Sequence, residues 1–158
     1  RFSSMKFEIG GLQMKSPLEI VKKRFENDNY AKQLGIVLDE VTDATIQMHM
    51  PLRSDMLNWF GRIHGGVIYS LADAAFSVIT NNDNNLSVAL ECSITYHASP
   101  DPETVLTVRG ETLAKTKKTA SYLFKIFVEK EKSCTLVATM KSVSYRTGRL
   151  VDTETGVG

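Results

Sequence analysis

The sequence predicts an α+β fold in which one antiparallel sheet wraps around one apolar helix. Residues 65–80 have the pattern of a helix whose only charged residue is Asp73. A helix on an ordinary protein surface carries a broad charged face, so this one is expected to be covered on nearly all sides. From residue 87 onward, apolar and polar side chains alternate with a period of two, which is typical of half-buried strands. A sheet that encloses the helix accounts for both patterns.

The first half of the chain is predicted to contain two short helical segments and two strands before the central helix. Ser16, Pro17 and Glu19 form a capping-box pattern, so a helix is expected from there to about Glu26. One more turn is predicted at 30–33. Extended runs follow at 35–41 and 44–51, then a loop at 53–63 and the central helix at 65–80.

Four strands in a meander are predicted after the polar break at 81–85. They span 87–98, 103–114, 119–130 and 134–146, joined by hairpins at 115–118 and 131–133. In the first of them, one face is predicted to carry Val88, Leu90, Cys92, Ile94 and Tyr96. Residues 1–15 are interpreted as an N-terminal extension or tag remnant, 16–147 as a single domain and 148–158 as a polar tail.

Composition excludes several classes of function. A net charge of +1 over 158 residues argues against a dedicated nucleic-acid binder. The chain has no apolar run of about 18 residues, so no membrane span is expected. The first residues lack the apolar core of a signal peptide, and a cytoplasmic location is expected. Cys92 and Cys134 lack metal-ligand spacing, so they are predicted to be reduced core thiols, and no metal site is expected.

The central helix divides into two faces on a helical wheel. One side, predicted to pack on the core, carries Val67, Ile68, Leu71, Ala75, Val78 and Ile79; the other carries Gly66, Tyr69, Ser70, Asp73, Ser77 and Thr80. The second face is polar but almost uncharged, which favours a protein interface or an active site over open water. A lone carboxylate on such a face is costly unless it is satisfied or used. Asp73 is therefore the first candidate site residue, with a solvated surface residue as the alternative.

The start of the helix offers hydrogen-bond donors. Gly65 and Gly66 lie in the first turn, where unpaired N–H groups can polarise a carbonyl. His64 precedes the turn, and Asn58 lies on the preceding loop, where it either binds substrate or braces the loop through backbone bonds. Asp73 is nine residues beyond His64, roughly 13 Å along a helix, which is too far for both to act on one carbonyl. We therefore expect an obligate two-fold dimer with shared sites.

These residues carry a family resemblance. Asn58, Gly61, His64-Gly65-Gly66 and Leu71-Ala72-Asp73 occur in the order and spacing of the hotdog-fold acyl-CoA thioesterases of the PaaI-like, phenylacetate-degradation type. The chain resembles this family over about residues 25–145. His-Gly-Gly with an aspartate eight residues after its first glycine is a fairly specific signal in this order of elements, whereas His-Gly-Gly alone is a weak one.

The resemblance implies hydrolysis of the thioester between an acyl group and coenzyme A. Gly65 N–H would polarise the thioester carbonyl, while Asn58 and His64 would hold the thioester region. Asp73 from the partner chain would act as general base or as nucleophile. Ser77, one turn further on, would position the water. A second water-holding serine of some relatives falls on about Ala89, so this chain lacks that hydroxyl.

The resemblance also places the coenzyme A nucleotide along the end of one strand and a following hairpin. The implied substrate-binding residues are Gly66, Arg62, Tyr96, Ser99, Pro100, Lys115, Lys117, Lys118 and Thr119. The lysines would put positive charge near phosphates, although a lysine-rich turn is otherwise most often a solvated hairpin. Coenzyme A is part of the substrate, and no separate cofactor is expected. Dimers are expected to pair into a homotetramer.

Two other functions remain open at the level of sequence. A non-catalytic acyl-CoA binder or sensor would keep the groove and the lysines but would not need Asp73. A hotdog enoyl-CoA hydratase would pair a histidine with an acidic residue for proton transfer, and the position of His64 before the two glycines fits that poorly. Aryl-acetyl, medium-chain and short-chain acyl groups all remain open as substrates.

Overall fold

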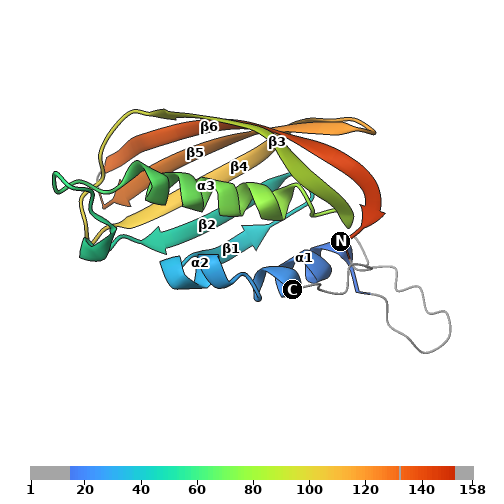
Figure 1. Ribbon diagram of the computed structural model, residues 1–158, viewed down its shortest axis with the longest axis horizontal. Helices are drawn as coiled ribbons and strands as arrows, with labels where there is room; N and C mark the ends of the chain where they lie inside the picture. Colours follow the sequence, from blue (N-terminus) through green and yellow to red (C-terminus); the bar gives the residue numbers. More distant parts are fainter. Residues whose placement is uncertain (1–14, 132, 152–158) are drawn as a thin grey trace.

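A six-stranded antiparallel sheet curves around helix α3 in the computed structural model, which describes residues 15–131 and 133–151. The helices are α1 (Pro17–Phe25), α2 (Asn29–Leu34) and α3 (Gly65–Ile79), with a short 3-10 helix η1 (Ser54–Met56). The strands are β1 (Val37–Val41), β2 (Thr45–Pro51), β3 (Asn85–Tyr96), β4 (Val105–Lys115), β5 (Thr119–Lys130) and β6 (Ser133–Leu150). Figure 1 shows α3 lying along one face of the sheet, with α1 and α2 beside β1. The predicted N-terminal extension (1–14) and the tail from residue 152 lie outside the described residues.

The helix boundaries follow from local capping chemistry. At α1, Glu19 N–H donates to Ser16 Oγ at 3.3 Å, and Ser16 N–H donates to the Glu19 carboxylate at 2.7 Å. This confirms the predicted capping box. At α2, Ala31 N–H donates to the Asp28 carboxylate at 2.9 Å, and Gly35 ends the helix with a φ of 75°.

The order of strands in the sheet is β1-β2-β4-β5-β6-β3. Strands β4, β5 and β6 form a meander as predicted, but β3 lies at the far edge and pairs with β6, so the predicted four-strand meander is wrong. The reason is where the chain leaves α3. Thr80, directly after the helix, donates to Ser144 Oγ of β6 at 2.7 Å, which brings the chain to β6, whereas both edges of β4 are already paired with β2 and β5.

Strand β3 contains a bulge that the alternating sequence pattern conceals. Ala89 pairs with Ser144 and Glu91 with Val143, which leaves Leu90 as one extra residue on β3. A one-residue insertion moves the following side chains to the other face of the sheet. The prediction that all alternate residues from Val88 to Tyr96 share one face is therefore wrong, because the alternation shifts at the bulge.

The core lies between α3 and the inner face of the sheet. Phe76 is buried and meets Tyr122 and Phe124 of β5 in edge-to-face contacts, with ring centroids 5.5 and 6.1 Å apart. Thr80, predicted on the outward face, is instead buried, because its hydroxyl bonds Ser144 and accepts from Tyr122 at 3.1 Å. Cys134 is exposed, so the prediction of two core thiols is wrong for this residue. No helix within the described ranges is long and apolar enough to cross a membrane.

Gly110 of β4 is expected to tolerate no side chain. A Cβ at this position would lie 2.4 Å from Phe124 Cε1 and 2.9 Å from Ile46 Cγ2, both in the core. We expect Gly110→Ala to lower the free energy of unfolding by about 1–3 kcal/mol, measured by urea denaturation. Adding Phe124→Leu to Gly110→Ala should cost less than the sum of the two single changes. Strict additivity would show that the clash is not the cause.

Candidate active site at the start of helix α3

The first turn of α3 is capped by a histidine. His64 Nδ1 accepts the Gly66 N–H at 2.9 Å, which requires that Nδ1 carry no proton in this contact. The Val67 N–H bonds the His64 carbonyl at 3.0 Å. The Gly65 N–H has no hydrogen-bond partner within residues 15–131 and 133–151. One donor is therefore left free at the positive end of the helix.

Gly65 lies against Tyr96, and Gly66 has a steric reason to be glycine. The Tyr96 hydroxyl donates to the Gly65 carbonyl at 3.1 Å, and a Cβ at Gly65 would touch the tyrosine ring at 3.4 Å. A Cβ at Gly66 would lie 3.0 Å from His64 Nδ1, which is tight enough to disturb the cap. The His-Gly-Gly sequence therefore lets the capping ring lie close against the first turn.

Asn58 braces the loop before the helix, one of the two roles left open for it. Its side-chain oxygen accepts from the Phe60 N–H at 3.2 Å and the Arg62 N–H at 3.0 Å. Its own N–H donates to the Arg62 carbonyl at 2.7 Å, and Gly61 closes the turn with a φ of 79°. These bonds use the amide oxygen. The amide nitrogen has no partner among the residues that the structure describes.

A cavity of about 390 Å³ opens beside Gly65. It brings together five residues singled out from the sequence, namely Asn58, Arg62, Gly65, Tyr96 and Ser99. His97 and Ala98 also line it, from the stretch 96–100 in which the resemblance places coenzyme A, whereas sequence reasoning missed Phe60, Ile63 and Ile68. Phe60 stands within the Asn58–Gly61 motif, which is the signal in the sequence that points to it. Pro100 is buried just past the cavity and is not one of its lining residues.

Asp73 lies eight residues beyond Gly65 on the same helix, about 12 Å along its axis. Burial, and then the nearby negative charge of Asp28, raise the pKa of the Asp73 carboxyl above its ordinary value. Its side chain has no hydrogen bond to any described residue. Ser77 is exposed, and its hydroxyl donates to the Ala74 carbonyl at 2.8 Å. One chain therefore does not bring Gly65 and Asp73 to the same carbonyl.

Hydroxyl groups line the outward face of α3 between these two residues. Ser70 donates to the Gly66 carbonyl at 2.7 Å and bonds the hydroxyl of Tyr30 at 3.0 Å, which ties α2 to α3. A hydrogen bond with Cys92, together with burial, raises the pKa of Tyr69 to about 12. This face thus carries polar groups that are neutral at ordinary pH, with Asp73 as the exception.

The predicted phosphate-binding hairpin lies at the opposite end of α3. Lys115 Nζ approaches the carboxylate of Asp83 at 3.2 Å, and Arg146 Nη2 approaches it at 2.8 Å. Burial alone would raise the pKa of Asp83, but the hydrogen bonds and charges of Arg146 and Lys115 hold it below its ordinary value. Lys118 lies 5.7 Å from the Tyr145 ring centroid.

Within one subunit, this hairpin, which includes Lys117 and Thr119, therefore lies at the opposite end of α3 from the Gly65 cavity. Arg146 was not predicted from the sequence. Its pairing with a residue 63 positions away leaves no sequential signal.

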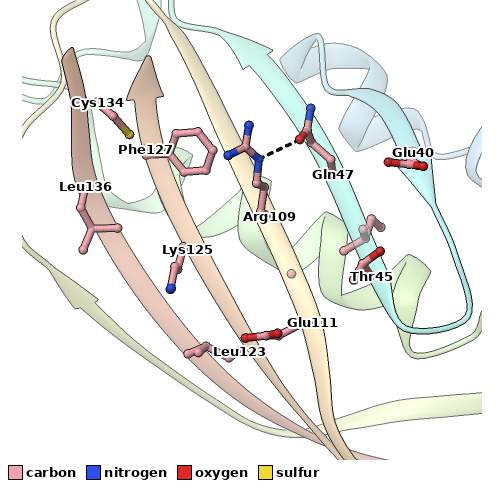
Figure 2. Close-up of a pocket in the computed structure, with 12 residues that line it drawn as sticks. Glu40, Thr45, Gln47, Arg109, Glu111, Leu123, Lys125, Phe127, Cys134 and Leu136 are labelled. Atoms are coloured by element: carbon pink, nitrogen blue, oxygen red, sulfur yellow. Dashed lines mark hydrogen bonds between the residues drawn. The ribbon is translucent and has the colours of Figure 1, made fainter. Parts of the chain in front are cut away.

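A larger cavity, of about 550 Å³, lies on the outer face of the sheet, away from α3 (Figure 2). Arg109 spans it, donating to the Gln47 side chain at 2.9 Å and lying 4.6 Å from the Phe127 ring centroid. Its lining includes no residue predicted for the site. Within the described parts of the chain, no group of three or more histidine, cysteine, aspartate or glutamate residues is placed to hold a metal ion.

Comparisons with known proteins identify the family of this chain. The Thioesterase superfamily model matches residues 60–135. A putative esterase of Archaeoglobus fulgidus is 30% identical over 92% of this chain and 94% of its own length. The acyl-coenzyme A thioesterase PaaI of Escherichia coli K12 is 30% identical over 82% of this chain and 91% of its own length. The chain belongs to the thioesterase superfamily.

The fold leads to the same family. The structure of the E. coli PaaI protein from the phenylacetic acid degradation operon superposes with a TM-score of 0.78 and 27% identity, covering 85% of this chain and 99% of that one. This thioesterase therefore has the hotdog fold that the resemblance implied, and the family makes it a thioester hydrolase.

The cap on α3 is expected to contribute measurably to stability. His64→Ala removes the acceptor for the Gly66 N–H and should lower the free energy of unfolding by about 1 kcal/mol in urea denaturation. His64→Asn supplies another side-chain acceptor and should recover most of that loss. If both variants lose the same amount, the stabilisation comes from other contacts of the ring and not from the cap.

Proposed function

We propose that this thioesterase hydrolyses acyl-coenzyme A thioesters to a free acid and coenzyme A. The observation that carries the proposal is the free Gly65 N–H at the head of α3, next to a cavity large enough for a thioester group. The relative named acyl-coenzyme A thioesterase supports the choice of substrate class. Hydrolysis consumes water alone, so the proposed chemistry requires no metal or redox cofactor.

The carbonyl end of the site comes from one subunit. The Gly65 N–H donates to the thioester oxygen, and the aligned peptide dipoles of α3 favour the negative charge that develops there. Asn58 has its amide nitrogen available to orient the substrate. His64, capping Gly66 through Nδ1, presents its other ring nitrogen to the same region.

The water-activating end comes from the second subunit. Asp73 of the partner subunit either takes a proton from a water that attacks the carbonyl, or attacks the carbonyl itself and is released by water in a second step. In both routes the carbon–sulfur bond breaks and coenzyme A leaves as the thiol. A raised carboxyl pKa makes Asp73 a stronger base than an ordinary aspartate. The partner subunit's Ser77, one turn along, is assigned to hold the water.

The free edge of β3 supports a two-fold dimer of this kind. Strand β3 pairs only with β6 among the described strands, so its other edge has unpaired backbone groups. Val88, Leu90 and Tyr96 on it are 49%, 60% and 48% exposed. Antiparallel pairing of two copies along this edge would cover those side chains and bring the two α3 helices together in opposite directions.

The same two-fold arrangement would join the two halves of the nucleotide site. The Gly65 cavity, with Gly66, Arg62, Tyr96 and Ser99 in or near it, lies at one end of α3, and the hairpin lies at the other. Lys117 and Lys118 of the partner subunit would then supply positive charge near the phosphates. Lys115 is the weaker candidate, because Asp83 already pairs with it.

Dimers are further proposed to pair as tetramers through the outer sheet face. The hollow in Figure 2 combines apolar walls, Leu123, Phe127 and Leu136, with charges of both signs, Glu111 and Lys125. Such a mixture suits contact between two copies of the same surface.

A non-catalytic acyl-CoA binder is the second candidate function. It would use the same cavity, but it would have no use for an unpaired, half-buried carboxylate whose desolvation costs stability. The retained Asp73 therefore favours hydrolysis. A hydratase finds less support, because His64 uses one ring nitrogen to cap α3.

Turnover is expected to depend on Asp73. We expect Asp73→Asn to lower kcat by about 100-fold or more, while coenzyme A derivatives still bind, because the amide cannot take the proton. Thiol release from a panel of acyl-CoAs measures this. Asp43→Asn, on the exposed turn between β1 and β2, is the matched control and should keep full activity. Unchanged turnover in Asp73→Asn would refute the proposal.

The pH profile should reflect the environment of Asp73. The deprotonated form is active, so kcat/KM should rise with pH through a pKa above 3.8, the ordinary value for aspartate. Asp28→Asn removes the like charge and should move this acidic limb to lower pH. Asparagine caps α2 as well as aspartate does, so the helix should persist. An acidic limb that stays in place would mean that the charge of Asp28 does not act on the catalytic group.

A further inference from the structure

An aromatic pair stands on the turn before α3, outside the roles assigned above. Trp59 is 94% exposed and Phe60 is 60% exposed, with their rings edge to face at a centroid distance of 4.9 Å. Phe60 has one side in the Gly65 cavity, but Trp59 is not part of the lining. A tryptophan this exposed is unusual on a protein surface that has no binding partner. Tryptophan also commonly anchors protein interfaces.

Hydrogen bonds fix the backbone of the turn that carries Trp59. Asn58 accepts from two backbone N–H groups across the turn and donates to the Arg62 carbonyl. Leu57 and Ile63 form a bridge at its base, and the His64 N–H bonds the Met56 carbonyl at 2.9 Å. Because the backbone is already fixed, little conformational entropy would be lost when Trp59 is buried against another surface.

A matching cavity of about 320 Å³ lies at the other end of α3. Its apolar lining consists of Val21, Phe25, Val78, Leu86 and Val151, and its polar lining consists of Arg24, Asn27, Asp28, Ser77 and Asn81. Ser77 lies twelve residues beyond Gly65, about 18 Å along the helix. Figure 1 shows the turn projecting beyond the start of α3, whereas α1 lies toward the end of α3. The turn and the cavity of one chain are therefore far apart.

The shared site proposed above determines which part of the partner faces this turn. If Gly65 lies beside the partner's Asp73 in antiparallel helices, then the turn that precedes Gly65 lies toward the partner's Ser77, which is four residues after Asp73. The turn at 58–61 then faces 77–80 of the second copy, where the cavity opens.

We propose that Trp59 of each subunit inserts into the cavity between α1 and α3 of its partner, forming two equivalent anchors of the dimer. The inference rests on the proposed shared-site dimer and adds the residue that secures it. Each anchor joins the turn that carries Asn58 and His64 to the helix that carries the partner's Asp73. Formation of the dimer and alignment of the two halves of the site are then one event.

Trp59 is the only tryptophan in the chain, so its fluorescence reports this contact directly. The experiment dilutes the full chain through its dimer dissociation range, with sedimentation velocity and tryptophan emission measured on the same samples. We expect emission at shorter wavelength and weak acrylamide quenching in the dimer, and both should change to those of an exposed indole as monomer forms. Leu86→Glu, which places a carboxylate in the cavity wall, should leave the indole exposed even in the residual dimer.

Variants test the energetic role. Trp59→Ala should raise the dimer dissociation constant roughly 30-fold, because loss of a buried aromatic anchor is among the largest single effects at interfaces. Trp59→Phe should recover part of this. Leu113→Ala removes an exposed apolar side chain of β4 that belongs to neither surface, and it should change nothing.

The outcomes separate this inference from the proposed function. A dimer whose tryptophan remains exposed and quenchable overturns the anchor but leaves the shared site standing. A tryptophan that becomes shielded only when an acyl-CoA is added assigns Trp59 to the substrate and also overturns the anchor. A chain that is monomeric at all concentrations, yet hydrolyses acyl-CoAs, overturns both the anchor and the shared site.

Discussion

The covering of α3 is the constraint on which the rest of this structure depends. Leu71, Ala72, Ala75 and Ile79 are fully buried against the sheet, so the helix is stable only where the strands curve around it. Among the described helices, α3 is the one that contacts β2, β3, β4, β5 and β6, so it provides most of the apolar cover of their inner face. Chain order, strand register and the curvature of the sheet all serve this one contact, and they fix where α3 begins and ends relative to the strands.

The outward face of α3 is only partly covered, so its polar groups also need hydrogen-bond partners. Its hydroxyl groups are satisfied within the chain, as the Gly66–Ser70–Tyr30 hydrogen bonds show. On this face of α3, two groups have no hydrogen-bond partner among the described residues, the Gly65 N–H and the Asp73 carboxylate. Unpaired polar groups on a partly buried surface cost stability, and proteins retain such costs mainly where chemistry needs them. The pattern of satisfied and unsatisfied groups is therefore better evidence for a site than the presence of polar residues alone.

The sequence predicted the elements of this fold well, because capping boxes and periodicity are local. It failed where the answer depended on contacts across the sheet. No local pattern tells which edge β3 joins, and the bulge at Leu90 reverses the faces of a strand that reads as regular. Asp73 and Gly65 were found because the lack of other charged residues in the helix and the pair of adjacent glycines can be recognised in the sequence itself. The Tyr96 contact with Gly65 and the pairing of Arg146 with Asp83 were not, because their partners are distant in sequence.

Placing the donor and the base on one rigid helix has a consequence for control. About 12 Å of helix separates Gly65 from Asp73, and no side-chain rotation closes that gap. If both groups act on one carbonyl, each subunit alone holds two half-sites that cannot react, and a dimer holds two complete ones. Activity would then follow the population of dimer by mass action. Any contact that stabilises the dimer would therefore raise the measured activity at a given protein concentration. Selection on turnover would thereby act also on the surfaces that join the two subunits, including Trp59 on the turn before α3 and the free edge of β3.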